Sequence, residues 1–160
     1  MPTAYMMCGI PYSGKSYYIS NDKTLQKLPI VSTDNTILRI AKARGKTYND
    51  VFKDTYQDAQ EEMMSDLNKY FREKKDFIFD RTNLTVKARK RWVDMFHKNG
   101  YNVVVIGFKA PDDKTIEMRR QLRRNQVIDD KILKGMKAQY QMPTMAELNK
   151  KTDKVIIVGN

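Results

Sequence analysis

The residues best suited to chemistry lie near the start of the chain, where residues 9–16, GIPYSGKS, fit the pattern G-x-x-x-x-G-K-[ST]. The segment directly follows a short apolar run, Thr3 to Cys8, that has the composition of a β-strand. Only backbone amides without bulky side chains can surround a triphosphate at close range, which explains the two glycines. The motif therefore predicts a phosphate-binding loop (P-loop), whose cofactor-binding residues are Gly9, Ser13, Gly14, Lys15 and Ser16.

Two side chains of the P-loop have distinct expected roles. Lys15 reaches the β- and γ-phosphates and is the first predicted catalytic residue. Ser16 offers a hydroxyl to the first shell of a magnesium ion, which prefers oxygen ligands, and is the predicted metal-binding residue. The loop therefore predicts a nucleoside triphosphate with Mg²⁺ as cofactors.

Two aspartates fall at or just after the ends of later apolar runs. In open parallel sheets the ligand lies beyond the carboxyl ends of the strands, so Asp34 and Asp80 can both face the phosphates. Asp34 is the predicted base that accepts the proton of an attacking hydroxyl, and the alternative is that it caps the following helix. Asp80 is expected to order Mg²⁺ or a phosphate-binding side chain. Arg81 follows it where a hydrolase would more often place a water-orienting carboxylate, which favours transfer over hydrolysis.

Four arginines gather near residue 120, with spacings that place them on one stripe of a helix: Arg119, Arg120, Arg123 and Arg124. Like charges on one stripe repel each other, and an anion among them would relieve that repulsion. Arginine is also the usual residue to neutralise the charge that develops on a phosphoryl group during transfer. The stripe is therefore expected to contact the cofactor, and the alternative is a solvated basic face.

The rest of the chain predicts the scaffold that brings these segments together. Short apolar runs alternate with stretches of helical periodicity, the pattern of a parallel sheet covered by helices. The five predicted strands are Thr3–Cys8, Pro29–Ser32, Asp76–Asp80, Asn102–Phe108 and Lys154–Val158. The predicted helices include a long one over residues 48–71, Thr85–Lys98 with Thr85 as a candidate N-cap, Asp112–Arg124 and Asp129–Tyr140. We expect a three-layer α/β fold, with a five-stranded parallel sheet between helices, in one domain over residues 1–160.

The composition indicates the class of partner. The chain carries 30 Lys and Arg against 19 Asp and Glu, and the net charge of +11 at pH 7 attracts phosphate-bearing partners. The alternative is that the charge serves solubility alone. Cys8 is expected to pack inside an apolar run, and His97 to be structural or exposed. The chain has no long apolar stretch and no signal peptide, which predicts a cytoplasmic protein.

Together these motifs resemble the bacteriophage polynucleotide 5′-kinase domain over nearly the whole chain. The resemblance lies in the strand followed by G-x-P-x-S-G-K-S, the Asp after the second strand, the D-x-T-N-L motif at residues 80–84 and an Arg-rich lid segment at about residues 111–128. It implies a P-loop kinase fold in which the loop Lys and Ser hold ATP and Mg²⁺. It further implies that the Asp is the general base toward a 5′-hydroxyl and that a lid Arg contacts the phosphates. By motif position these residues are Lys15, Ser16, Asp34 and Arg123, with Arg119 also predicted to bind the cofactor.

One departure from the family concerns the acceptor. The family's arginine for the acceptor phosphate, three residues after the base, is Ile37 here, and the nearest replacement is Arg39. The residues expected to bind the acceptor substrate are Arg39, Asp80, Arg81, Thr82 and Asn83. No phosphatase domain follows the kinase motifs, so kinase activity alone is expected.

The resemblance therefore predicts a kinase that transfers the γ-phosphoryl group of ATP to a 5′-hydroxyl of DNA or RNA, with nucleic acid as partner. Two alternatives stay open. Related P-loop kinases carry the same motifs, so the acceptor could be a hydroxymethylated pyrimidine base in phage DNA or a small molecule. The chain could instead be a nucleic-acid-binding ATPase that uses the P-loop as a conformational switch.

Overall fold

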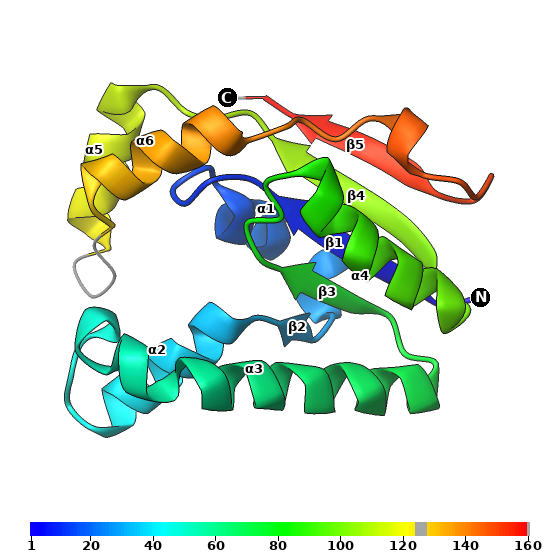
Figure 1. Cartoon of the computed structure of the whole chain (residues 1–160), viewed down its shortest axis with the longest axis horizontal. Helices are drawn as coiled ribbons and strands as arrows, with labels where there is room; N and C mark the ends of the chain where they lie inside the picture. Colours follow the sequence, from blue (N-terminus) through cyan, green and yellow to red (C-terminus); the bar gives the residue numbers. More distant parts are fainter. Residues whose placement is uncertain (124–127, 160) are drawn as a thin grey trace.

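A computed structural model describes residues 1–123 and 128–159 of the chain. In this part of the chain five strands form one sheet in the order β2-β3-β1-β4-β5, and each neighbouring pair is parallel (Figure 1). The strands are β1 (Thr3–Cys8), β2 (Ile30–Val31), β3 (Phe77–Asp80), β4 (Asn102–Phe108) and β5 (Lys154–Val158). The predicted α/β fold with a five-stranded parallel sheet is confirmed.

The helices occupy the segments between the strands. They are α1 (Lys15–Asn21), α2 (Thr33–Ala43), α3 (Tyr48–Glu73), α4 (Val86–Lys98), α5 (Asp113–Leu122) and α6 (Asp130–Gln139), with short 3-10 turns at Leu25–Lys27 and Met145–Glu147. The second strand is shorter than predicted, because Pro29 contributes only its carbonyl, to Ile78 N at 2.9 Å, and Ser32 leaves the sheet to cap α2. Thr85 caps α4 as predicted, accepting a hydrogen bond from Ala88 N at 3.1 Å.

Different helices cover the two faces of the sheet. Along β1, Met6 and Cys8 belong to the apolar cluster with α3 and α4, whereas Met7 belongs to the cluster with α1. Alternate residues of a strand point to opposite faces, so one short apolar strand serves both helical layers. Cys8 packs in the core, as predicted, and burial raises the pKa of its thiol to about 12. The sheet is therefore the middle of three layers.

The lid segment lies beyond the carboxyl ends of the strands. Its helix α5 contributes Ile116, and the next helix along the chain, α6, contributes Leu133, to an apolar cluster that includes Tyr12 of the P-loop. Figure 1 shows α5, α6 and α2 at the end of the molecule where the P-loop leaves β1. Residues 124–127 of the lid segment, among them Arg124, lie outside the described residues.

The single histidine has a structural partner. His97 Nε2 lies 2.8 Å from Asp153 Oδ2, and Asp153 Oδ1 accepts a hydrogen bond from Val103 N at 2.9 Å. This contact joins α4 to β4 and to the segment before β5, so the structural role predicted for His97 is confirmed. Across the described ranges, no helix combines the length and the apolar character needed to cross a membrane.

Candidate active site

The P-loop closes on itself and on the residues after β3. Lys15 Nζ donates to Gly9 O at 2.9 Å, and Gly9 N donates to Thr82 O at 2.9 Å. A Cβ at position 9 would lie 2.7 Å from Ser13 Oγ and 3.1 Å from Phe108 Cβ, so this close approach requires glycine. Gly14 has a φ of 96°, which a residue with a side chain adopts only with strain. Both predicted glycines are therefore required by the shape of the loop.

One polar atom of the loop has no partner of its own. Ser13 is buried, and within the described part of the chain its Oγ has no hydrogen-bond partner. Buried hydroxyls are normally hydrogen-bonded, since an unmade bond costs on the order of 1–3 kcal/mol. A phosphate oxygen held by the loop would supply the missing partner. The loop therefore fits an anionic ligand on its own geometry.

The lid segment holds the P-loop at Tyr12. This residue has a φ of 70°, which is unusual for a side chain of its size. Arg119 Nη1 donates to Tyr12 O at 2.5 Å, Ile128 N donates to Tyr12 Oη at 3.3 Å, and the Arg120 guanidinium lies 5.9 Å from the ring centroid. The residue of the P-loop with this unusual conformation is thus contacted by three residues of the lid segment.

A cavity of about 730 Å³ lies in front of the P-loop. Its size is within the range of small-molecule sites in proteins. Most of the predicted site residues line it, and they come from the P-loop, α2, the end of β3 and the lid: Gly14, Lys15, Ser16, Asp34, Asp80, Arg81, Thr82 and Arg123. The fold therefore gathers cations, carboxylates and hydroxyls from four segments around one space.

The charged groups of this active-site cavity alter one another's protonation. Burial lowers the pKa of the Lys15 ammonium, and the nearby carboxylates of Asp80 and Asp34 oppose that shift. Burial also raises the pKa of Asp80; Asp34 adds to the increase, while Lys15 and Arg123 oppose it. Carboxylate and hydroxyl oxygens are the ligands that Mg²⁺ prefers, and Asp80 and Ser16 supply them here. These two residues would hold the ion beside the phosphates.

Asp34 does not cap α2. The cap is Ser32, whose side chain accepts a hydrogen bond from Asn35 N at 3.3 Å, and Asp34 lies in the first turn of the helix. The alternative role for Asp34 is therefore wrong, and its carboxylate is free to line the cavity. Tyr48, at the start of α3, donates its hydroxyl to Asp34 Oδ1 at 2.6 Å. Burial and this bond raise the pKa of Tyr48, so the phenol remains a donor.

The sequence gives no direct sign of the Tyr48 contact. The two partners are 14 positions apart and meet only because α2 and α3 pack together through Ile37 and Val51. The available signal is indirect: Thr47 and Asp50 form a capping box, which places Tyr48 at the first position of α3. The contact orients one carboxylate oxygen and leaves the other for a ligand.

Three predicted site residues have partners outside the cavity. Arg39 Nη2 lies 2.9 Å from both carboxylate oxygens of Glu62, and Arg39 is not among the residues that line the cavity. Arg119 binds the P-loop backbone at Tyr12 and likewise does not line the cavity. Asn83 is buried, and its side-chain amide donates to Met7 O at 2.8 Å. The structure thus gives these three residues partners within the protein, and their contacts with a ligand stay predictions.

The position that carries the acceptor arginine in the resembling family points elsewhere in this fold. Ile37 is fully buried between α2 and α3, with Ala41, Val51 and Ala59. The side chains of α2 that line the cavity are Asp34, Asn35 and Leu38. Helix α2 therefore brings no cation to the cavity.

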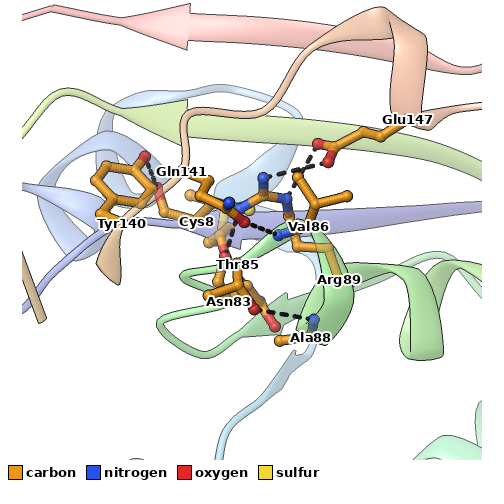
Figure 2. A network of polar contacts seen from close by, with 10 residues as sticks. Cys8, Asn83, Thr85, Val86, Ala88, Arg89, Tyr140, Gln141 and Glu147 are labelled. Atoms are coloured by element: carbon orange, nitrogen blue, oxygen red, sulfur yellow. Dashed lines mark hydrogen bonds and ion pairs between the residues drawn. The ribbon is translucent and has the colours of Figure 1, made fainter. Parts of the chain in front are cut away.

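A buried polar network supports the back of the P-loop (Figure 2). Arg89 is 1% exposed; its Nη1 donates to Asn83 O at 2.8 Å, and its Nε lies 3.0 Å from Glu147 Oε1. Tyr140 Oη donates to the carbonyls of Cys8 and Phe108, at 3.2 and 2.8 Å. The network thus connects the end of β1, the loop after β3 and the segment before β5.

Sequence reasoning missed Arg89, although the sequence does contain a signal. Arg89 precedes Trp92, Val93 and Phe96 by three, four and seven residues, so it shares the apolar face of α4. A charged residue on that face requires a buried partner, and Glu147 supplies it. The pair could not be predicted because Arg89 and Glu147 are 58 positions apart in the sequence.

A parallel α/β sheet with a P-loop after its first strand, and with charged groups at the carboxyl ends of its strands, defines a P-loop nucleotide-binding domain. The chain belongs to the AAA domain family, whose model matches residues 5–143. No curated protein matches the chain.

Two of the solved structures that match the chain show its fold. One is a provisionally named kinase from Chloroflexus aurantiacus, with a TM-score of 0.69 and 14% identity over 99% of this chain and 85% of that one. The other belongs to the PezAT toxin-antitoxin system of Streptococcus pneumoniae, with a TM-score of 0.61 and 16% identity over 78% of this chain. The match covers 55% of that second chain, so the present chain corresponds to about half of it. At these identities the likeness concerns the fold.

Proposed function

We propose that the protein is a Mg²⁺-dependent kinase that transfers the γ-phosphoryl group of ATP to the 5′-hydroxyl of a nucleic acid. The observation that carries the proposal is the pairing in one cavity of a P-loop lysine with Asp34, a carboxylate oriented by Tyr48. The fold shared with a provisionally named kinase and the net charge of +11 support it.

Each residue has a role that follows from its chemistry. Lys15 and Arg123 neutralise phosphate charge, Ser16 and Asp80 provide oxygen ligands for Mg²⁺, and Asp34 accepts the proton of the acceptor hydroxyl. As that proton leaves, the hydroxyl oxygen forms a bond to the γ-phosphorus, and the bond from the γ-phosphorus to the bridging oxygen breaks to release ADP. Bound Mg²⁺ supplies charge neutralisation on the phosphate oxygens.

Transfer of radiolabel tests the proposal. The protein is incubated with γ-labelled ATP, Mg²⁺ and a 5′-hydroxyl oligonucleotide that contains a hydroxymethylated pyrimidine within the strand, and the product is digested to 5′-mononucleotides. We expect label on the nucleotide from the 5′ end and none with the Lys15→Ala variant. Label on modified bases within the strand would instead support the base-directed kinase. Loss of ATP without any labelled acceptor would support the ATPase switch.

A further inference from the structure

Two further cavities continue from the active-site cavity along α4 and α3. The first, of about 320 Å³, shares Arg81 and Thr82 with the active-site cavity. The second, of about 380 Å³, shares Arg91 and Trp92 with the first. Each cavity therefore borders the next through shared wall residues, and we call the two further cavities together the arginine groove. It leads from the loop after β3 to the side of α3.

Two guanidinium groups of this groove carry charge that no carboxylate neutralises. Arg81 and Arg91 lie 5.6 and 5.0 Å from the centroid of the Trp92 ring. Among the described residues, neither forms an ion pair, whereas Arg39, Arg89 and Arg120 each pair with a carboxylate. A cation–π contact with the indole ring does not occupy the N–H donors of the guanidinium. Arg81 Nη1 also donates to Met63 Sδ at 3.9 Å, so the donors left for an anion are the other N–H groups of Arg81 and those of Arg91.

The groove suits a chain of alternating phosphates and bases. A guanidinium presents donors in a fork that matches two phosphate oxygens. Beyond Arg91, the second cavity is lined by neutral polar side chains that can hydrogen-bond to base edges: Gln57, Gln60, Ser65 and Asn68. Glu61 also lines this cavity and is the one carboxylate among the described residues of the groove. The positive charge is therefore concentrated near the active site, where the first phosphates of an acceptor strand would lie.

We propose that the arginine groove binds the nucleotides that follow the reacting 5′ end of a single-stranded nucleic acid, with backbone phosphates on Arg81 and Arg91. Single strands fit because amides can read base edges only when these are not engaged in pairing. This inference rests on the proposed function, which it extends by assigning the path of the acceptor. It also offers a physical reason why the acceptor side can lack a cation from α2: the groove supplies two.

The test compares two variants of α4 that each remove one positive charge. Arg91→Gln changes the groove, and Lys87→Gln changes an exposed residue that lines none of the three cavities. Glutamine preserves helix propensity in both. Fluorescence anisotropy measures binding of a labelled 5′-hydroxyl dinucleotide and octanucleotide at several salt concentrations, with thermal denaturation as the check on folding.

We expect Arg91→Gln to weaken octanucleotide binding about tenfold and to reduce the salt slope by about 0.7, the value for one phosphate contact on a single strand. Dinucleotide binding should change less than twofold, and Lys87→Gln should change neither affinity by more than about twofold. Equal losses in the two variants would overturn the groove, as would equal losses for the two lengths in Arg91→Gln. Absence of octanucleotide binding by the unaltered protein would overturn it too.

The same samples separate this proposal from the proposed function. If the octanucleotide binds in an Arg91-dependent manner but receives no label from ATP, the groove is supported and the kinase activity is wrong. If short and long acceptors are labelled equally well by both variants, with unchanged KM, the kinase activity is supported and the groove is wrong.

Discussion

The charged groups on the two sides of the P-loop differ in how they are paired. Behind the loop, Arg89 and Glu147 form a buried pair, and the guanidinium also donates to a backbone carbonyl. In front of it, burial shifts the pKa values of Lys15 and Asp80, which line the active-site cavity. The charged groups at the back are therefore paired and hold the loop in position, whereas those at the front line a cavity that a ligand can enter.

This contrast has an energetic basis. A charge taken out of water is costly unless it is paired, and breaking an existing buried pair leaves an uncompensated charge. Variants at the back should therefore lose stability, whereas variants at the front should lose activity with little effect on folding. The following changes test that division.

The largest expected effect on activity is that of Asp34→Asn at the front. The amide has nearly the same shape but cannot accept the hydroxyl proton, so transfer should fall roughly 100- to 10,000-fold, the usual contribution of a general base. Steady-state labelling of an oligonucleotide measures it, with KM for ATP expected to change little. Near-normal turnover would show that Asp34 is not the base.

Lys15→Ala should reduce transfer roughly 100- to 1,000-fold, because a preorganised charge is removed from the phosphates. Unlike Asp34→Asn, it should also weaken ATP binding, which calorimetry detects. Since burial disfavours this ammonium, thermal stability should not fall. A large loss of stability would mean that Lys15 belongs with the structural side of the loop.

Glu147→Gln tests the back. It leaves Arg89 buried without its charged partner, and the free energy of unfolding should fall by about 3–5 kcal/mol, as for other broken buried pairs. Urea denaturation measures the loss. Lys90→Gln is the matched control, because the Lys90–Asp94 pair is exposed and should contribute little. Equal effects of the two changes would contradict the contrast between front and back.

Tyr48→Phe removes only the hydroxyl that orients Asp34. Hydrogen bonds to charged groups contribute about 1.5–3 kcal/mol, so kcat should fall at least tenfold while KM for ATP stays constant. Tyr56→Phe is the control on the same helix, since its hydroxyl contacts Gln60 and not Asp34. A change in KM with constant kcat would show that Tyr48 acts on substrate binding instead.

The smallest expected effect concerns pH. Asp80 must be ionised to bind Mg²⁺, and its raised pKa means that it takes up a proton at higher pH than an exposed aspartate as the solution is acidified. Lys15 must be protonated to attract phosphate, and its lowered pKa means that it loses the proton at lower pH than an exposed lysine. Affinity for MgATP should therefore be confined to a narrower pH window, which calorimetry across pH measures. The acid limb should be absent in Asp80→Asn; an unchanged limb would assign it to another group.

The sequence predicted the parts of the site that depend on local chemistry. The P-loop could be located because glycine spacing and the preceding apolar strand are contiguous in the chain, and strand ends placed Asp34 and Asp80 near it. The partners of Arg119 and Asn83 could not be predicted in this way. Arg119 bonds to a residue 107 positions away and Asn83 to one 76 positions away, and no local pattern records such contacts.

What the sequence by itself determined is therefore the alternation of strands and helices, the position of the P-loop and the sign of the net charge. Backbone conformation and apolar periodicity depend on residues that are close together in the sequence, so both can be predicted from it. Only the tertiary structure decided which charges are paired and which are left open, as between Arg89 and Arg91 on one helix. The physical reason is that a side chain's partner is set by how helices pack, and a two-residue step along a helix is enough to move an arginine from the core to the groove.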